Sequence, residues 1–237
     1  MDFRLEICCA DLQSLRAAIA GGAHRVELCQ ALGLDGLTPS AGMIETAVNS
    51  GIAVHVLIRP REGNFVYSED EVDCMLRDIR MARQLGAQGV VIGALTPDGD
   101  IDLSACRQMI EAAGEGMHVT FHRAFDVCRH PQEALMKVYA LGCDRLLTSG
   151  QAPSAEEGIG LLKELVAETK QFEPREECGV RGSVLHIMPG AGVSPLNAAR
   201  IIKETGATEI HGSLRKNGHT DAVMVHDVIS RVLSAVG

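Results

Sequence analysis

Short runs of β-branched and aliphatic residues alternate along this chain with longer stretches in which apolar residues recur at helical spacing. The joint between a helical stretch and the next apolar run repeats a glycine followed by a small residue, as at Gly86-Ala87. Such a glycine accepts the left-handed conformation that closes a helix. The pattern predicts strands over residues 3–8, 24–29, 53–58, 89–92, 117–122, 144–147, 184–188 and 209–211.

Strict alternation of strand and helix indicates the α/β class, with a parallel sheet and right-handed crossovers. Eight such units within 237 residues fit a (β/α)8 TIM barrel, which typically needs roughly 250 residues. We therefore expect one barrel domain spanning residues 1–237, with the polar stretch 171–182 as an exposed loop at its bottom. An open doubly wound sheet is the alternative, but its glycine-rich fingerprint is absent after the first strand.

Several of the predicted strands have one apolar and one polar face. In the first strand, Leu5 and Ile7 alternate with Glu6 and Cys8. The outer face of a barrel strand packs against helices, so the polar set is expected to point into the barrel. Buried charges need partners, and a connected interior network is therefore expected. Its deeper members, for which a purely structural role is favoured, are Arg4, Arg25, His55 and His118.

Barrel enzymes collect their chemistry at the carboxyl ends of the strands. The candidate catalytic residues at these ends are Glu6, Glu27, Arg59, His122, Arg123, Asp126 and His211. The two glutamates would act as acid and base, and His122 would shuttle a proton. The two arginines would hold an anionic substrate, with Asp126 orienting one of them.

Glycines follow the last predicted strands, where bare backbone amides can surround an anion. Pro189-Gly190-Ala191-Gly192 follows the seventh strand and Gly212-Ser213 follows the eighth. Tight turns are the alternative reading of these glycines, since every strand-to-helix loop needs turn residues. The candidate anion-binding residues are Ser149, Gly150, Gly190, Gly192, Gly212 and Ser213.

Charge and composition exclude several classes of partner. The chain has 22 Lys and Arg against 31 Asp and Glu, and its basic residues form no stripe, so we expect no nucleic-acid partner. The first residues are charged and no apolar run approaches the roughly 18 residues of a membrane span, so a cytoplasmic location without membrane contact is expected. The eight cysteines form no C-x-x-C motif and are expected to be mostly free thiols.

Several short sequence motifs occur along the chain, and together they resemble those of the CutC family of copper homeostasis proteins. The resemblance runs in order from about residue 3 to residue 215. A local departure is Glu62-Gly63-Asn64-Phe65, where the family typically has two glycines, an aspartate and a phenylalanine. The motifs are Glu6-Ile7-Cys8, Glu27-Leu28-Cys29, Ile58-Arg59-Pro60-Arg61, Gly93-Ala94-Leu95-Thr96, Phe121-His122-Arg123-Ala124-Phe125-Asp126, Thr148-Ser149-Gly150, Met188-Pro189-Gly190 and His211-Gly212-Ser213.

The resemblance implies a cytoplasmic TIM barrel linked to copper tolerance that associates as a homodimer or higher homo-oligomer. It also places a copper ion on cysteines near the first strands, which are Cys8 and Cys29 in this sequence. The residues themselves leave two functions open. Copper(I) prefers soft thiolate ligands, which favours the cysteine pair. An enzyme acting on a small anionic or phosphorylated metabolite would use more of the polar residues, and a non-catalytic binding barrel is a third class.

Overall fold

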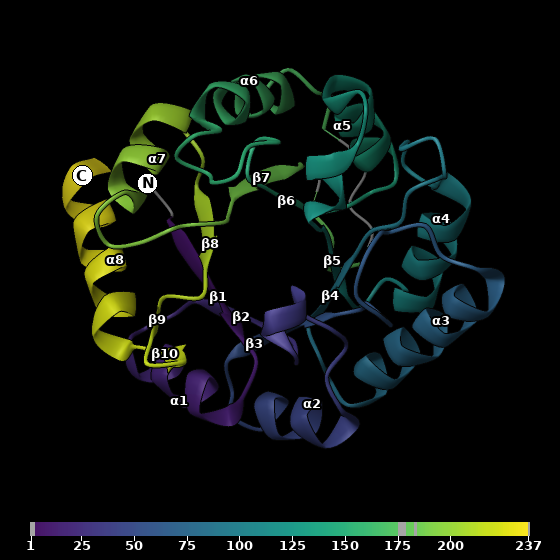
Figure 1. The fold of residues 1–237 in the computed structure, drawn as a ribbon, viewed down its shortest axis with the longest axis horizontal. Helices are drawn as coiled ribbons and strands as arrows, with labels where there is room; N and C mark the ends of the chain where they lie inside the picture. Colours follow the sequence, from purple (N-terminus) through teal and green to yellow (C-terminus); the bar gives the residue numbers. More distant parts are fainter. Residues whose placement is uncertain (1–2, 175–178, 183, 237) are drawn as a thin grey trace.

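The computed structural model describes residues 3–174, 179–182 and 184–236, and it confirms the predicted (β/α)8 barrel. Parallel strands form the barrel wall, in the order β7-β6-β5-β4-β3-β2-β1-β8. Figure 1 looks down this wall, with the helices arranged around it. The strands are β1 (Arg4–Cys9), β2 (Arg25–Leu28), β3 (Ala53–Leu57), β4 (Gly89–Ile92), β5 (His118–Phe121), β6 (Arg145–Thr148), β7 (His186–Pro189) and β8 (Glu209–Gly212).

The helices cover the outside of the barrel, and short 3-10 helices and a small hairpin lie in the loops of the described residues. The α-helices are α1 (Leu12–Ala20), α2 (Ala41–Val48), α3 (Glu69–Gln84), α4 (Leu103–Ala113), α5 (Pro131–Ala140), α6 (Ile159–Thr169), α7 (Ala198–Thr205) and α8 (Ala222–Val236). The loop elements are η1 (Leu32–Leu34), η2 (Arg123–Val127), β9 (Arg215–Lys216) and β10 (His219–Thr220). None of the described helices is long and apolar enough to span a membrane.

The register of β1 distinguishes the barrel from an open sheet. The first strand pairs with β2 on one side and with β8, the last strand of the wall, on the other. An open doubly wound sheet would not bring the first and last of these strands together. The strands β7 and β8 are neighbours, yet no ladder of hydrogen bonds joins them within the described residues, so the wall is nearly closed.

Helix α3 illustrates how local sequence sets an element's bounds. Ser68 accepts a hydrogen bond from the Glu71 amide while the Glu71 carboxylate accepts one from the Ser68 amide, a capping box that pairs two otherwise free donors. The chain then leaves the helix through Gly86, whose φ of +87° suits glycine. Strand β4 follows after two further residues. Short joints of this kind bring each strand back to the barrel wall.

The main hydrophobic core lies between the strands and the helices, as the alternation of faces predicts. Leu5 and Ile7 are fully buried in this layer, while Glu6 between them faces the barrel interior and is also fully buried. A separate small apolar cluster lies inside the barrel and is made by Cys8, Cys29, Leu57 and Val91. Both cysteines of the predicted copper pair therefore belong to the barrel interior.

Two of the predicted deeper network members lie elsewhere. Arg4 lies at the start of β1, where the strand reaches the bottom of the barrel, and its side chain is exposed. Arg4 is therefore not one of the buried network residues. His118 is half-buried at the start of β5, with its Nδ1 atom 3.2 Å from an Asp144 carboxylate oxygen. Arg25 and His55 are buried as predicted.

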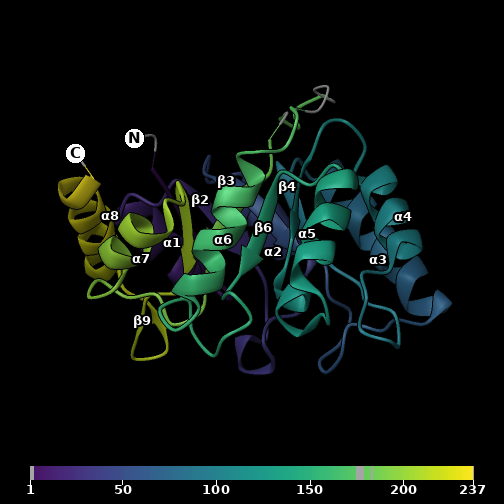
Figure 2. The same ribbon diagram turned by 90° about the horizontal axis from the view of Figure 1, so that it is seen from above.

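The two ends of the barrel differ in Figure 2. The β9 strand and the loop after β2 lie at the lower edge, which is the end where the wall strands finish. The chain after α6 projects from the opposite edge. Of the predicted loop over 171–182, residues 175–178 lie outside the described residues, and the remainder contains no helix or strand of the wall.

Candidate functional site

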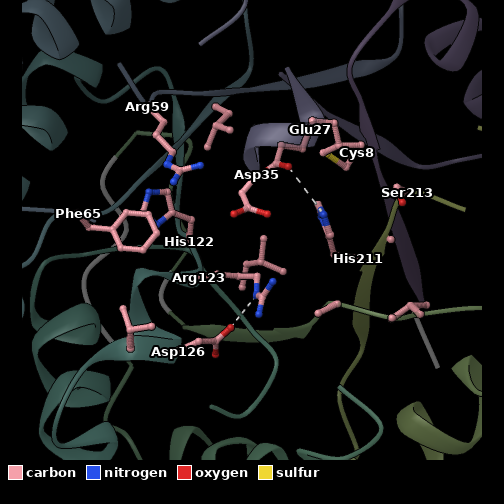
Figure 3. A pocket seen from close by; sticks show the side chains of 18 of the residues that line it. Cys8, Glu27, Asp35, Arg59, Phe65, His122, Arg123, Asp126, His211 and Ser213 are labelled. Atoms are coloured by element: carbon pink, nitrogen blue, oxygen red, sulfur yellow. Dashed lines mark hydrogen bonds and ion pairs between the residues drawn. The ribbon is translucent and has the colours of Figure 1, made fainter. Parts of the chain in front are cut away.

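A cavity of about 480 Å³ opens at the carboxyl ends of the strands. This is the end of the barrel where the sequence places its candidate chemistry, and the volume suits a small metabolite. Figure 3 shows polar side chains pointing into the cavity from opposite walls. Its polar and charged lining residues are Cys8, Glu27, Asp35, Arg59, His122, Arg123, Asp126, His211 and Ser213.

A ladder of buried ion pairs lies inside the barrel below the cavity. Arg25 donates to Glu6 through Nε and to Glu209 through Nη2, the second contact at 2.6 Å. Arg145 approaches the same Glu209 oxygen at 2.8 Å. Burial alone would raise the pKa of Glu6, but Arg25 and His211 outweigh it and hold that pKa well below its usual value. Glu6 is therefore a carboxylate whose charge is matched within the barrel.

His211 connects this ladder to the cavity. Its Nδ1 atom donates to Glu6 Oε1 at 2.8 Å, and its Nε2 atom lies 3.8 Å from Glu27 Oε2. Burial opposes the charged imidazole, but the two carboxylates raise the pKa of His211 above its usual value. Burial, together with the Glu6 charge, raises the pKa of Glu27 in spite of His211. Both pKa values are raised, so His211 holds its proton more firmly and Glu27 accepts one more readily than either group does in water.

The predicted copper cysteines are in contact. The Cys8 and Cys29 sulfur atoms are 3.6 Å apart, and both residues are buried. Cys8 lines the cavity, whereas Cys29 is not one of the lining residues. The hydrogen bond with Cys29, burial and the Glu27 charge all raise the pKa of the Cys8 thiol. Cys8, Glu27 and His211 also form a group whose ligand atoms lie within 4.8 Å of one another, a mixed donor set that a metal ion could use.

Arg59 ties together the loops that follow β2 and β3. Its Nη1 atom donates to the carbonyls of Leu34 and Gly36 at 2.9 and 3.1 Å, and its Nη2 atom donates to the Gly63 carbonyl at 3.0 Å. The guanidinium also lies 5.2 Å from the centre of the Phe65 ring. The Nε atom of Arg59 has no hydrogen-bond partner among the described residues. The Arg59 side chain thus holds the loops of the cavity wall in place and also gives this wall a positive charge.

His122 lies beside Arg59 in Figure 3 and is almost fully buried. Its Nδ1 atom accepts a hydrogen bond from the Ala124 amide at 3.1 Å, which caps η2. Burial and the charge of Arg59 lower the pKa of His122 to about 3. The imidazole is therefore neutral at physiological pH, with its proton on Nε2, and that atom has no hydrogen-bond partner.

Asp126 organises the loop that follows β6. It accepts hydrogen bonds from the Thr148 hydroxyl, from the Ser149 amide at 3.0 Å and from the Gln151 amide at 3.3 Å. It also pairs with Arg123 Nε at 2.7 Å. Both Asp126 and Arg123 line the cavity, and the Arg123 side chain is nearly half exposed.

The predicted anion-binding residues fall into two groups. Gly192, Gly212 and Ser213 line the cavity. Ser149, Gly150 and Gly190 do not line it, and their amides donate to Asp126, Thr148 and Thr148 respectively. Amides that are already paired in this way are poorly placed to surround an added anion.

Several residues at the site were not predicted from the sequence. Glu209 and Arg145 complete the ion-pair ladder, and Asp35 and Phe65 project into the cavity from loops. Glu209 alternates with the outward-facing Ile210, so the same face rule could have found it. Asp35 has a φ of +62°, and its position depends on a backbone path that no periodicity describes.

Comparisons with known proteins agree on one family. The CutC family model matches residues 3–216. A CutC family protein of Pasteurella multocida is 48% identical over 209 residues, covering 88% of this chain and 80% of that protein. A second one, from Chromobacterium violaceum, is 50% identical over 216 residues, covering 91% of this chain and 82% of that protein.

Solved structures extend the comparison to the fold. The crystal structure of a CutC protein from Streptococcus agalactiae, which is named for copper homeostasis, has a TM-score of 0.78 and 35% sequence identity. It covers 89% of this chain and 98% of that one. Thiamine phosphate pyrophosphorylase from Pyrococcus furiosus has a TM-score of 0.63 at 15% identity over 100% of this chain and 98% of that one, a likeness of fold alone. The family model and the curated relatives cover most of the chain, which therefore belongs to the CutC family.

Proposed function

We propose that this protein binds Cu(I) through the thiolates of Cys8 and Cys29. The observation that carries the proposal is the contact between the two sulfur atoms, 3.6 Å apart in the barrel interior with Cys8 at the cavity wall. Cu(I) favours soft thiolate ligands in low coordination, and neighbouring strands hold these two at a separation that one ion can bridge. The name of the Streptococcus agalactiae relative supports copper as the ion.

Copper binding at this pair would displace the two thiol protons. The Cys8 thiol holds its proton strongly, since its pKa is raised, and Glu27 beside it has a raised pKa suited to receiving a proton. Metal affinity at such a pair falls as pH falls, because protons compete with the ion for the sulfur atoms. His211, whose pKa is also raised, would balance the negative charge of the copper-bound thiolates.

The test is an anaerobic Cu(I) titration against a competing chelator. Cys8→Ser and Cys29→Ser are each expected to lower the affinity at least about tenfold, because each removes one of two soft ligands. Cys106→Ser is a matched control, since Cys106 is equally buried but lies on α4 in the outer core. Unchanged affinity in both cavity variants would contradict the proposal. A Zn²⁺ titration run alongside tests the mixed set of Cys8, Glu27 and His211.

A second candidate function is acid–base catalysis on a small anionic or phosphorylated metabolite. The relay from Glu6 through His211 to Glu27, which ends at a cavity of about 480 Å³, favours it. Glu27 would take a proton from the substrate, His211 would supply or accept one, and Glu6 would hold the imidazole in position. Arg123 would attract the anion, while Gly192, Gly212 and Ser213 would contact a phosphate if one is present.

A screen for thermal stabilisation by anionic and phosphorylated metabolites tests this second function. At least one metabolite is expected to stabilise the wild type and to be turned over. Glu27→Gln is expected to keep the binding and lose about 100-fold in turnover, since general acid–base groups contribute on that order. A screen without any stabilising metabolite, or turnover that survives Glu27→Gln, would refute acid–base catalysis here.

A further inference from the structure

Buried arginines in this barrel differ in how their charge is matched. Arg25 and Arg145 are 4% and 7% exposed, and each pairs with at least one buried carboxylate. Arg59 is equally buried, at 4% exposed, yet none of the ion pairs among the described residues includes it. Its guanidinium donates to the neutral carbonyls of Leu34, Gly36 and Gly63, and the Tyr67 hydroxyl that also interacts with it is uncharged as well. A buried cation without a counter-ion is costly, and the cavity is the place from which one can come.

His122 adds a second unmatched group at the same wall. Its Nδ1 atom accepts from the Ala124 amide, which places the proton on Nε2, and Nε2 has no hydrogen-bond partner among the described residues. The imidazole stays neutral beside Arg59, so it offers a donor without adding a second charge. The Phe65 ring packs on both, with its centre 4.9 Å from the His122 ring centre and 5.2 Å from the Arg59 guanidinium carbon. The unmatched atoms and the aromatic face lie together on one side of the cavity (Figure 3).

We propose that the cavity binds a small metabolite carrying a carboxylate, and that this carboxylate lies at the wall formed by Arg59 and His122. The inference rests on the cavity of the second candidate function but not on its proton-transfer chemistry. One positive charge and two free N–H donors match a carboxylate, which has one charge and two oxygens. A phosphate, with up to two charges and three free oxygens, would leave part of its charge unmatched here. Phe65 is the side chain that would shift to admit the ligand, because its ring packs against both the His122 ring and the Arg59 guanidinium.

The Asp35 carboxylate of the protein itself would compete with a bound carboxylate for the positive charge of Arg59. This exposed carboxylate lies in the cavity, but no ion pair to Arg59 is present among the described residues. Removing that carboxylate lowers the negative potential of the cavity, so an added carboxylate is expected to bind Asp35→Asn at least as tightly as the wild type. Failure of Asp35→Asn to bind would overturn the proposed arrangement.

Calorimetric titration of the metal-free, reduced protein with malate, citrate, pyruvate and inorganic phosphate tests the proposal. At least one of the carboxylates is expected to bind. Arg59→Met is expected to weaken that binding at least about tenfold, because it removes a charge-assisted contact. Arg129→Met is the matched control, since this exposed arginine pairs with Asp100 outside the cavity, and its affinity is expected within about twofold of wild type.

Because Arg59 also ties loops together, His122→Asn provides an independent variant. The asparagine oxygen can still accept the Ala124 amide, while the Nε2–H donor to the cavity is lost. We expect about threefold to tenfold weaker carboxylate binding, with a smaller decrease in melting temperature than in Arg59→Met because the cap of η2 is kept. Unchanged binding in His122→Asn and Arg59→Met, or binding of phosphate but of none of the carboxylates, overturns the proposal. If a carboxylate binds but is not turned over, only the acid–base function is refuted. If a ligand is turned over equally well by wild type and Arg59→Met, only the proposed carboxylate site is refuted.

Discussion

Replacing Arg25 with methionine tests the physical account of the barrel interior. Arg25 is 4% exposed and is hydrogen-bonded to both Glu6 and Glu209. Methionine keeps much of the volume of the side chain but removes the charge and the donors. Glu6 would then keep only its contact with His211 and the more distant His55, while Glu209 would keep Arg145.

Breaking a buried ion pair from one side costs about 3–5 kcal/mol, because the remaining charge stays buried without its partner. Arg25 serves two carboxylates, so the upper part of that range is expected. For a domain of this length each 1 kcal/mol corresponds to about 2–4 °C in melting temperature. With about 4–5 kcal/mol lost, the predicted decrease in melting temperature is about 8–20 °C.

The loss should depend on pH in a defined direction. In the wild type the Glu6 pKa is lowered, so the stability that Glu6 contributes is present above its ordinary value of 4.5 and is lost as pH falls through the lowered value. Without Arg25, burial is opposed by His211 and His55 alone, so the Glu6 pKa is expected to rise and the folded variant to gain stability on binding a proton. The difference between variant and wild type is thus expected to narrow as pH falls from 7 toward 4.5.

Urea unfolding of both proteins across this pH range measures the effect. Arg77→Met serves as control, since Arg77 pairs with Asp73 on the exposed face of α3 and its loss should cost no more than about 1 kcal/mol. A loss below about 1 kcal/mol for Arg25→Met, or a gap that widens on acidification, would refute the view of Glu6 as a charge held by Arg25.

Two further variants test the coupling of Glu27 with His211 and the backbone conformation at Gly150. Glu27→Gln should lower the pKa of His211, because the Glu27 charge helps to raise it, and an NMR titration of the imidazole that shows no decrease would argue against their coupling. Gly150→Ala should destabilise the fold by about 2 kcal/mol, because φ is +73° and an added Cβ would lie 2.6 Å from the Gly158 carbonyl oxygen. Unfolding by urea checks this value, and a neutral result would mean that the loop relaxes freely.

The architecture was largely predictable from the sequence, because alternation along each strand reports which face meets the helices. Leu5 and Ile7 lie in the outer core and Glu6 faces inward, as the period of two requires. Arg4 belongs to the same face as Glu6 but lies at the exposed end of β1. Periodicity gives the direction of a side chain and says nothing of its depth in the barrel.

The candidate site was predictable only in part. Cys8 and Cys29 meet because β1 and β2 are adjacent, and adjacency follows from chain order in a barrel. The partners of Arg59 are backbone carbonyls in loops, and the amide of Ser149 is taken by Asp126. These choices depend on loop paths, which residue types alone do not determine.

X-ray absorption at the copper edge of the Cu(I)-loaded protein tests the central claim most directly, because it reports which atoms bind the ion. Two sulfur ligands per copper ion are expected in the wild type, with one of them lost in Cys8→Ser and in Cys29→Ser. A spectrum with only nitrogen and oxygen ligands, or one with sulfur ligands that both variants leave unchanged, would contradict copper binding at this pair.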